Sequence, residues 1–159
     1  MKSIDKIYSI DSFIPVLKDW QRDGKVVFTN GCFDILHIGH VDYLEKARAL
    51  GSKLIVGLNT DASVQRIKGK ERPIVIEESR ARVMASLWFV DAVILFDENT
   101  PLELIGRIKP DILVKGDDYT LDKIIGADIV IGNGGEVKTI PLVSGFSTTN
   151  IVNKIKNLQ

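Results

Sequence analysis

The sequence has 159 residues, of which 45% are hydrophobic, and its 21 Lys and Arg side chains balance 21 Asp and Glu side chains. This length and composition predict one domain, residues 1–159, with an ordinary packed core. The zero net charge gives no sign of a nucleic-acid or membrane partner, and no apolar run approaches the roughly 20 residues that a membrane helix needs. One cysteine and a first segment unlike a signal peptide lead us to expect a cytoplasmic protein without disulfides.

Hydrophobic periodicity predicts helices that alternate with strands along the chain. The expected elements, in chain order, are helix 12–24, strand 25–30, helix 37–51, strand 53–59, a short helix from Thr60 or Asp61, helix 77–89, strand 91–96, helix 100–109, strand 111–116, a helical or irregular segment from Leu121, strand 136–142 and helix 147–156. Residues typical of helix caps and stops are Ser12, Gly24, Gly51, Thr100 and Ser147 or Thr148. In helix 37–51, the apolar repeat Ile38, Val41, Leu44 and Ala47 predicts the buried face.

The predicted strands, such as VVF, LIVGL, AVILF and ILV, are apolar almost throughout and lack the two-residue alternation of a half-exposed sheet. Buried parallel strands with helices on both faces have this composition. We therefore predict the α/β class, with a doubly wound, Rossmann-like parallel sheet. In such sheets, ligands bind beyond the carboxyl ends of the strands, at the point where the winding reverses.

Both histidines of the chain, His37 and His40, lie at the first predicted strand-to-helix crossover, with Gly39 between them. A helix start presents free N–H groups and a positive dipole to a phosphate, and Gly31 and Gly39 would allow close approach. Two imidazoles one turn apart could then stabilise charge in a transition state. The residues alone leave two alternatives open, namely a structural helix start with solvent-facing histidines and a two-histidine metal site.

The stretch GCFDILHIGH resembles the G-x-F-D-x-x-H-x-G-H signature of the HxGH nucleotidyltransferase superfamily, which includes cytidylyltransferases for glycerol 3-phosphate and phosphoethanolamine. The matching residues are Gly31, Phe33, Asp34, His37, Gly39 and His40. Together with RIKGKERP, VKGDDY, NGGEV and STTNIV, it is most similar to the branch of adenylyltransferases that make ADP-heptose. These occur alone or as the C-terminal half of a bifunctional kinase–adenylyltransferase, and since 159 residues leave no room for the kinase, we expect the free form.

This resemblance implies a set of site residues. The catalytic residues it implies are His37, His40 and Lys68. The nucleotide-binding residues it implies are Thr29, Asn30, Gly31, Cys32, Phe33, Gly39, His40, Lys68, Arg80, Asp117, Ser147, Thr148 and Thr149. The acceptor-binding residues it implies are Asp34, Lys115, Asp118 and Tyr119. We interpret Cys32 as a small packing residue of this site, because no base or second cysteine accompanies it in the sequence.

Three further stretches have both a functional and a structural interpretation. The basic loop RIKGKER could close over a triphosphate or could be a solvated surface loop, and Arg80 after it could be an ordinary helix-surface charge. VKGDDYT follows a buried strand, so its carboxylates could hold hydroxyls or a divalent ion and its lysine a sugar phosphate. It could equally be a turn with a solvated lysine. GFSTTN could bind phosphate at a helix start or only cap that helix.

The resemblance implies AMP transfer from ATP to D-glycero-β-D-manno-heptose 1-phosphate by direct in-line attack, which yields ADP-heptose and pyrophosphate. Mg²⁺ would bridge the phosphates without a protein cage, and a homodimer is usual among such enzymes. Leu142 and Val143 stand where the cytidylyltransferases usually carry an Arg-Thr pair, which disfavours cytidine. The alternatives are a cytidylyltransferase for a small alcohol phosphate such as glycerol 3-phosphate, and a non-catalytic nucleotide-binding domain. Signatures of P-loop kinases, dinucleotide oxidoreductases and serine hydrolases do not occur in the sequence.

Overall fold

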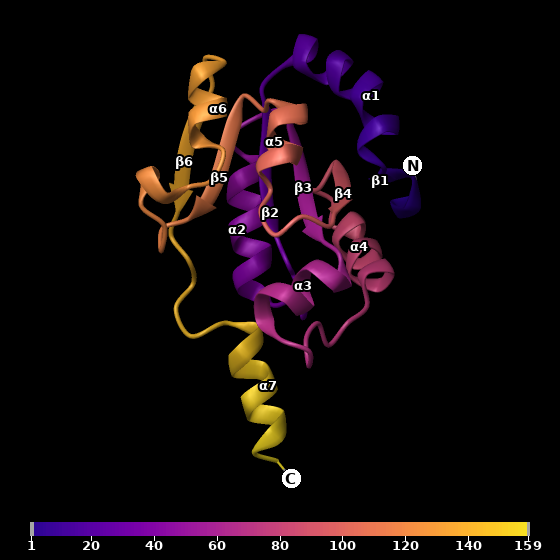
Figure 1. Ribbon diagram of the computed structural model, residues 1–159, viewed down its shortest axis with the longest axis vertical. Helices are drawn as coiled ribbons and strands as arrows, with labels where there is room; N and C mark the ends of the chain where they lie inside the picture. The colour runs from indigo at the N-terminus through magenta and orange to yellow at the C-terminus, as the bar shows by residue number, and fades with distance from the viewer. Residues whose placement is uncertain (1, 159) are drawn as a thin grey trace.

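Six parallel strands form one sheet in the computed structural model, which describes residues 2–158 (Figure 1). The strands are β1 Ile7–Tyr8, β2 Val26–Gly31, β3 Lys53–Asn59, β4 Ala92–Phe96, β5 Ile112–Gly116 and β6 Glu136–Ile140. Their order across the sheet is β1-β4-β3-β2-β5-β6, and every neighbouring pair is parallel. The chain therefore winds outward from β2 in one direction through β3 and β4, and in the other through β5 and β6.

Helices cover both faces of this sheet. The helical segments are η1 Ser3–Lys6, α1 Ile10–Asp23, α2 Ile38–Arg48, α3 Asp61–Lys68, α4 Glu77–Ser86, α5 Leu102–Ile108, η2 Leu121–Lys123, α6 Ala127–Gly132 and α7 Thr148–Lys156. Helices α2 and α4 contribute to one core, while α1, α5 and α6 contribute to the other. Among the described residues, no helix combines the length and apolarity needed to span a membrane.

The central strands are apolar over most of their length because each supplies side chains to both cores, whereas the edge strand β6, EVKTI, keeps Glu136 and Thr139 exposed. In β2, Val27 enters the core under α2 and α4, whereas Val26 and Phe28 enter the core under α1 and α5. Successive strand residues point to opposite faces of a sheet, so a sheet covered on both sides needs an apolar residue at each position. The predicted doubly wound α/β fold is confirmed.

Several predicted helix ends are wrong by a few residues. Helix α1 begins earlier than expected, because Ser9 is its N-cap and accepts a hydrogen bond from the N–H of Ser12 at 3.2 Å. Pro101, not Thr100, occupies the N-cap position of α5. Both differences are local, since neighbouring residues compete to satisfy the same free N–H groups at a helix start.

Helix α2 also differs from the prediction in its end and in its buried face. It ends at Arg48, so Gly51 does not close it. Gly51 instead allows close packing, since a Cβ there would lie 2.5 Å from the carbonyl oxygen of Lys25. On the helix itself, Ile38 was predicted to be buried but is 53% exposed, whereas Tyr43, which was not in the predicted face, is buried. The short edge strand β1 was not predicted, because two residues carry no periodicity.

The carboxyl ends of the strands all lie at one end of the sheet, and α7 projects beyond that end (Figure 1). The crossover from β2 to α2 is in the middle of the sheet, where β2 has β3 on one side and β5 on the other. The winding reverses between β2 and β5. The fold therefore places residues 31–37 and the segment after β5 together at the usual position of a ligand site.

Candidate functional site

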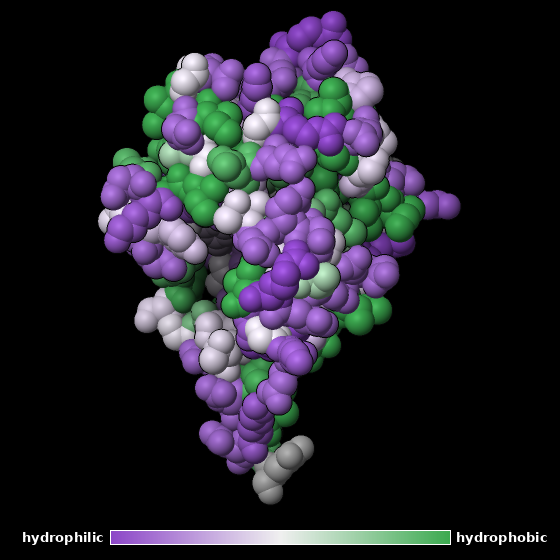
Figure 2. All heavy atoms as spheres, in the orientation of Figure 1, coloured by the Kyte–Doolittle hydropathy of each residue, from purple (hydrophilic) through white to green (hydrophobic). Residues whose placement is uncertain are grey.

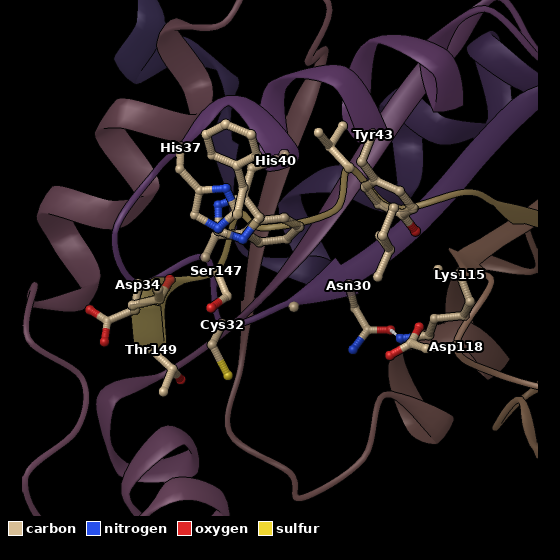
Figure 3. Close-up of a pocket in the computed structure, with 18 of the residues that line it drawn as sticks. Asn30, Cys32, Asp34, His37, His40, Tyr43, Lys115, Asp118, Ser147 and Thr149 are labelled. Atoms are coloured by element: carbon tan, nitrogen blue, oxygen red, sulfur yellow. Dashed lines mark hydrogen bonds between the residues drawn. The ribbon is translucent and has the colours of Figure 1, made fainter. Parts of the chain in front are cut away.

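A cavity of about 400 Å³ lies beyond the carboxyl ends of β2 and β5. Its walls come from the β2–α2 crossover, the last residue of α3, the turn after β5 and the segment that leads into α7. Figure 2 shows the surface hollowed near the end of β5, above α7, and Figure 3 shows the residues inside. We call this space the first cavity.

The residues Gly31 and Phe33 of the crossover build one wall together. Phe33 has a φ of 44°, in the left-handed region, and its ring folds back over Gly31. A Cβ on Gly31 would lie 2.9 Å from Phe33 Cε2, so only glycine fits there. The same ring meets His40 edge-on, with the ring centres 5.0 Å apart. The glycine and the phenylalanine of the signature thus shape the surface on which the second histidine rests.

The two histidines lie against each other with ring centres 3.8 Å apart and an interplanar angle of 25° (Figure 3). His37 is the N-cap of α2 but makes no side-chain cap bond, so the first N–H groups of the helix are left for another partner. A Cβ on Gly39 would lie 3.0 Å from His37 Nδ1. The glycine between the histidines is therefore needed to let the His37 ring lie over the first turn of the helix.

The surroundings of both imidazoles disfavour their charged forms. Burial, together with His37 and Lys68 nearby, lowers the pKa of His40 to about 4, and burial lowers the pKa of His37 as well. Within residues 2–158, the Nδ1 atoms of both rings are buried and have no hydrogen-bond partner. Buried polar atoms without a partner are rare in folded proteins, so the stacked pair is an unusual feature of this crossover.

Asp34 is buried, and its carboxylate is fully engaged with the basic loop, which we define as residues 66–72, and with the segment after it. It accepts hydrogen bonds from Arg72 Nε at 2.8 Å and from the N–H groups of Ile74 and Val75 at 2.9 Å. Burial acts to raise the pKa of Asp34, but these donors outweigh it and hold the pKa below its usual value. In Figure 3 the carboxylate points away from the histidines. In the structure the Asp34 carboxylate makes a loop-anchoring contact, and its expected acceptor-binding role stays a prediction.

Arg80, unlike Asp34, does not line the first cavity and lies behind its wall. Its buried guanidinium donates to the carbonyl oxygens of Val75 and Cys32 and to the Asp61 carboxylate, at 2.7–2.8 Å. It ties the crossover to α3 and to the segment before α4. The alternative of a surface charge is wrong, because Arg80 is only 2% exposed, and the expected nucleotide contact stays a prediction.

Two more predicted residues lie outside the first cavity. Thr29 is fully buried, and its hydroxyl shares a 2.8 Å hydrogen bond with the Tyr43 hydroxyl. Asp117 is exposed, and its carboxylate accepts from the N–H of Leu142 at 3.3 Å. Thr29 therefore supports the cavity from beneath through Tyr43, while Asp117 fixes the segment after β6.

The end of β5 brings polar side chains to the opposite wall. The Lys115 ammonium donates to the Asn30 amide oxygen, and it lies 5.7 Å from the centre of the Tyr119 ring. Burial lowers the pKa of Lys115 to about 8, against the opposing effect of Asp118. Figure 3 shows Asn30, Lys115 and Asp118 side by side.

The start of α7 closes the first cavity. Ser147 caps this helix by accepting from the N–H of Asn150 at 3.0 Å, as predicted. The Thr148 hydroxyl donates to the carbonyl oxygen of Ile35 at 3.3 Å, which connects α7 to the crossover. Thr149 also lines the cavity. The start of α7 therefore lies beside the crossover and the start of α2, where Phe146 Cβ would be 3.5 Å from a Cβ on Gly39.

A second cavity of about 320 Å³ adjoins the first. The side chains of Asn59, Asn99 and Thr100, which carry amide and hydroxyl groups, line the second cavity but not the first. Asn59 is 4% exposed and donates to the Ser63 hydroxyl at 3.0 Å. The residues that line both cavities are Asn30, Gly31, Cys32, Lys68, Lys115 and Tyr119.

Most of the expected site residues meet around the first cavity, although their roles stay predictions. Those that line it are Asn30, Gly31, Cys32, Phe33, Asp34, His37, Gly39, His40, Lys68, Lys115, Asp118, Tyr119, Ser147, Thr148 and Thr149. Sequence reasoning missed Tyr43 and Phe146, which also line it. Tyr43 is three residues after His40 on α2, so helical spacing could have indicated it. In the part of the chain that the structure describes, no group of three or more His, Cys, Asp or Glu residues could hold a metal ion.

Residues 28–154 match the cytidylyltransferase-like family. The chain is 59% identical over 137 residues to the bifunctional protein HldE of Magnetococcus marinus, a match that covers 86% of this chain and 28% of that protein. It is 55% identical over 151 residues to the protein of the same name from Syntrophotalea carbinolica, covering 94% of this chain and 31% of that one. The chain spans about a third of the length of these curated relatives.

Two solved structures resemble the fold. A lipopolysaccharide core biosynthesis protein from Thermoplasma volcanium is 34% identical, with a TM-score of 0.60, and the match covers 76% of this chain and 97% of that one. A pantoate–β-alanine ligase from Francisella tularensis is 16% identical, with a TM-score of 0.62, and the match covers 95% of this chain and 77% of that one. The second likeness concerns the fold alone.

Replacement of Asp34 by Asn should destabilise the protein by roughly 1–3 kcal/mol, because it leaves the Arg72 guanidinium and a backbone N–H with poor partners. Urea unfolding measures this loss. Asp42→Asn is the matched control, since Asp42 pairs with Lys46 on the surface of α2 and should cost less than about 1 kcal/mol. Equal losses in the two variants would contradict the anchoring role of Asp34.

The free energy of unfolding should depend on His40 in mildly acidic solution. The unfolded chain binds a proton at His40 near pH 6.5, whereas the folded protein does so only near pH 4. The free energy of unfolding therefore has its full value above pH 6.5 and decreases as the pH falls from 6.5 towards 4. Between those limits the wild type should lose roughly 3 kcal/mol more than His40→Gln in urea unfolding. Parallel stability curves for the two proteins would contradict a neutral His40.

Proposed function

Since the chain belongs to the cytidylyltransferase-like family, we propose that it transfers AMP from ATP to D-glycero-β-D-manno-heptose 1-phosphate, which yields ADP-heptose and pyrophosphate. The observation that carries this proposal is the histidine pair, which lies at a helix start in the wall of the first cavity. Two joined cavities suit a reaction between two substrates. The name of the Thermoplasma volcanium structure, a lipopolysaccharide core biosynthesis protein, suits a sugar-nucleotide product.

The first cavity is proposed to hold ATP. The helix starts of α2 and α7 both line it, and each favours negative charge. In this proposal the α-phosphate lies against His37 and His40, and the β- and γ-phosphates lie against Ser147 and Thr149. A neutral imidazole donates one hydrogen bond, and the negative charge that develops at the phosphate would raise its pKa and favour the charged form.

The second cavity is proposed to hold the sugar phosphate. Its amide and hydroxyl groups on Asn59, Asn99 and Thr100 are suited to sugar hydroxyls. A phosphate monoester is already an anionic nucleophile at neutral pH, so the reaction needs alignment and charge stabilisation rather than a strong base. An oxygen of the sugar phosphate attacks the α-phosphorus from the second cavity, and pyrophosphate leaves towards α7. Lys68 lines both cavities and stabilises the charge between them.

We also propose that ATP enters as its Mg²⁺ complex. Mg²⁺ usually keeps several waters and binds one or two carboxylates together with substrate phosphates. Asp118, a carboxylate that lines the first cavity, fits that donor set. The ion would add positive charge at the phosphate oxygens, while the protein groups named above align the two substrates.

A cytoplasmic homodimer is the proposed state of the protein. ATP as substrate and a single cysteine support the location. Exposed apolar side chains around α4 support an interface, because Ile76, Val83 and Trp88 are 60%, 46% and 76% exposed. Large exposed apolar side chains that gather near one element often mark a protein–protein interface.

A pyrophosphate-release assay with ATP and CTP, each against heptose 1-phosphate and glycerol 3-phosphate, tests the reaction. We expect release with ATP and heptose 1-phosphate, at a kcat/KM at least about tenfold above every other pair. Preference for CTP with glycerol 3-phosphate would favour a cytidylyltransferase instead. ATP binding without pyrophosphate release from any pair would favour a non-catalytic nucleotide-binding domain.

Lys68→Ala should lower kcat/KM by roughly 2–4 kcal/mol of transition-state stabilisation, as expected for a preorganised charge at the reacting phosphate. Lys70→Ala is the matched control, because Lys70 belongs to the same basic loop but lines neither cavity. Both variants should keep the wild-type free energy of unfolding, since both lysines are exposed. Similar kcat/KM values for the two variants would remove Lys68 from the proposed mechanism.

A further inference from the structure

Lys115 lies at the junction of the two cavities and lines both of them. Its side chain leaves the end of β5 and donates to the Asn30 amide oxygen at the end of the neighbouring strand β2 (Figure 3). None of the ion pairs formed by residues 2–158 includes this ammonium. Lys115 is thus a partly buried cation held by a neutral amide.

This arrangement costs stability unless a ligand compensates for it. Burial lowers the pKa of Lys115 to about 8, and the nearby Asp118 and Cys32 offset the effect only in part. A cation that has lost much of its water and has no counter-ion gains more than a solvated one from an incoming anion. The geometry therefore favours an anionic group at the junction, within reach of both cavities.

We propose that Lys115 is the specificity-determining residue for the acceptor, because it binds the acceptor's phosphate at the junction and admits only acceptors whose phosphate is a dianion. This inference rests on the proposed function and deepens it. In that reaction the attacking phosphate and the α-phosphate of ATP must approach each other although both are negative. Lys68 and Lys115 both line the junction, and the partly buried Lys115 is the more rigidly held of the two.

The groups that face Lys115 determine how this contact depends on pH. Asp118 and Tyr119 follow β5, Cys32 follows β2, and Lys68 ends α3. The other titratable side chains that line the two cavities are Asp34, His37, His40, Tyr43 and Lys123. Of these groups, Asp118 and Cys32 act to raise the pKa of Lys115, and burial outweighs them.

The free enzyme therefore carries the charge on Lys115 only below about pH 8. The kcat/KM for the acceptor should be level between about pH 6, where the phosphate becomes a dianion, and pH 8. Above pH 8 it should fall about tenfold per pH unit. The kcat should hold to higher pH, because the bound dianion raises the pKa of Lys115.

Steady-state kinetics of Lys115→Met and Lys115→Arg, with pyrophosphate release as readout, test this role. Lys115→Met should raise the KM for the acceptor roughly tenfold to a hundredfold, the loss expected for one hydrogen bond to a charged group. Lys115→Arg should keep part of the acceptor binding and lose the alkaline limb of kcat/KM, because a guanidinium does not deprotonate in this range. Lys138→Met is the matched control, since Lys138 pairs with Glu136 on the neighbouring strand β6, outside both cavities.

Three results would overturn the proposal. The first is an acceptor KM for Lys115→Met within about twofold of the control. The second is an alkaline limb that stays near pH 8 in Lys115→Arg. The third is a loss of affinity for a non-hydrolysable ATP analogue as large as the loss for the acceptor, because Lys115 would then serve the nucleotide or the fold.

A binding experiment separates this inference from the proposed reaction. Calorimetric titration with inorganic phosphate, in the presence of the same ATP analogue, needs no turnover. Phosphate should bind the wild type and Lys138→Met equally, and Lys115→Met roughly tenfold or more weakly. If the wild type released no pyrophosphate with any acceptor, the proposed reaction would fail, and this titration would still decide the role of Lys115. Equal phosphate binding by all three proteins would reject the role.

Discussion

The Asp34 carboxylate is the interaction on which the rest of the site depends. It is buried at the crossover between β2 and α2, and it accepts hydrogen bonds from Arg72 and from the N–H groups of Ile74 and Val75. A buried carboxylate is stable only when such donors surround it, so the contact fixes where the segment after α3 can lie. Because Lys68 ends α3 just before this segment, the anchor also limits where the basic loop can reach.

Charged groups around the site are of two kinds, those in ion pairs and those without one. Asp34 with Arg72 and Arg80 with Asp61 are paired, and they hold the walls together. Lys68 and Lys115 take part in no ion pair within residues 2–158, and they line both cavities. The proposed binding of two phosphorylated substrates would need this division, because a cation already paired with a carboxylate interacts less strongly with an incoming anion.

Burial prepares the same cavities for anions in a second way. It lowers the pKa of His40 to about 4 and that of Lys115 to about 8, because the charged form of each side chain has lost contacts with water. A phosphate that enters the cavities would reverse part of this effect by favouring the protonated forms. The protonated forms of His40 and Lys115 are therefore disfavoured in the free site, and a bound anion would favour them.

Local sequence was sufficient to determine the fold class and the position of the site. Strands such as VVF and LIVGL have no polar face, so they can only be buried between two helical layers, and His37, Gly39 and His40 are within one helical turn of each other. Tertiary structure alone decided which motif residues face the cavities. Asp34 and Arg72 are 38 residues apart, and Arg80 reaches Cys32 across 48, so no local spacing could assign their carboxylate and guanidinium to the walls. The second cavity and the junction at Lys115 likewise exist only because parallel strands bring the ends of β2, β3 and β5 to one edge of the sheet.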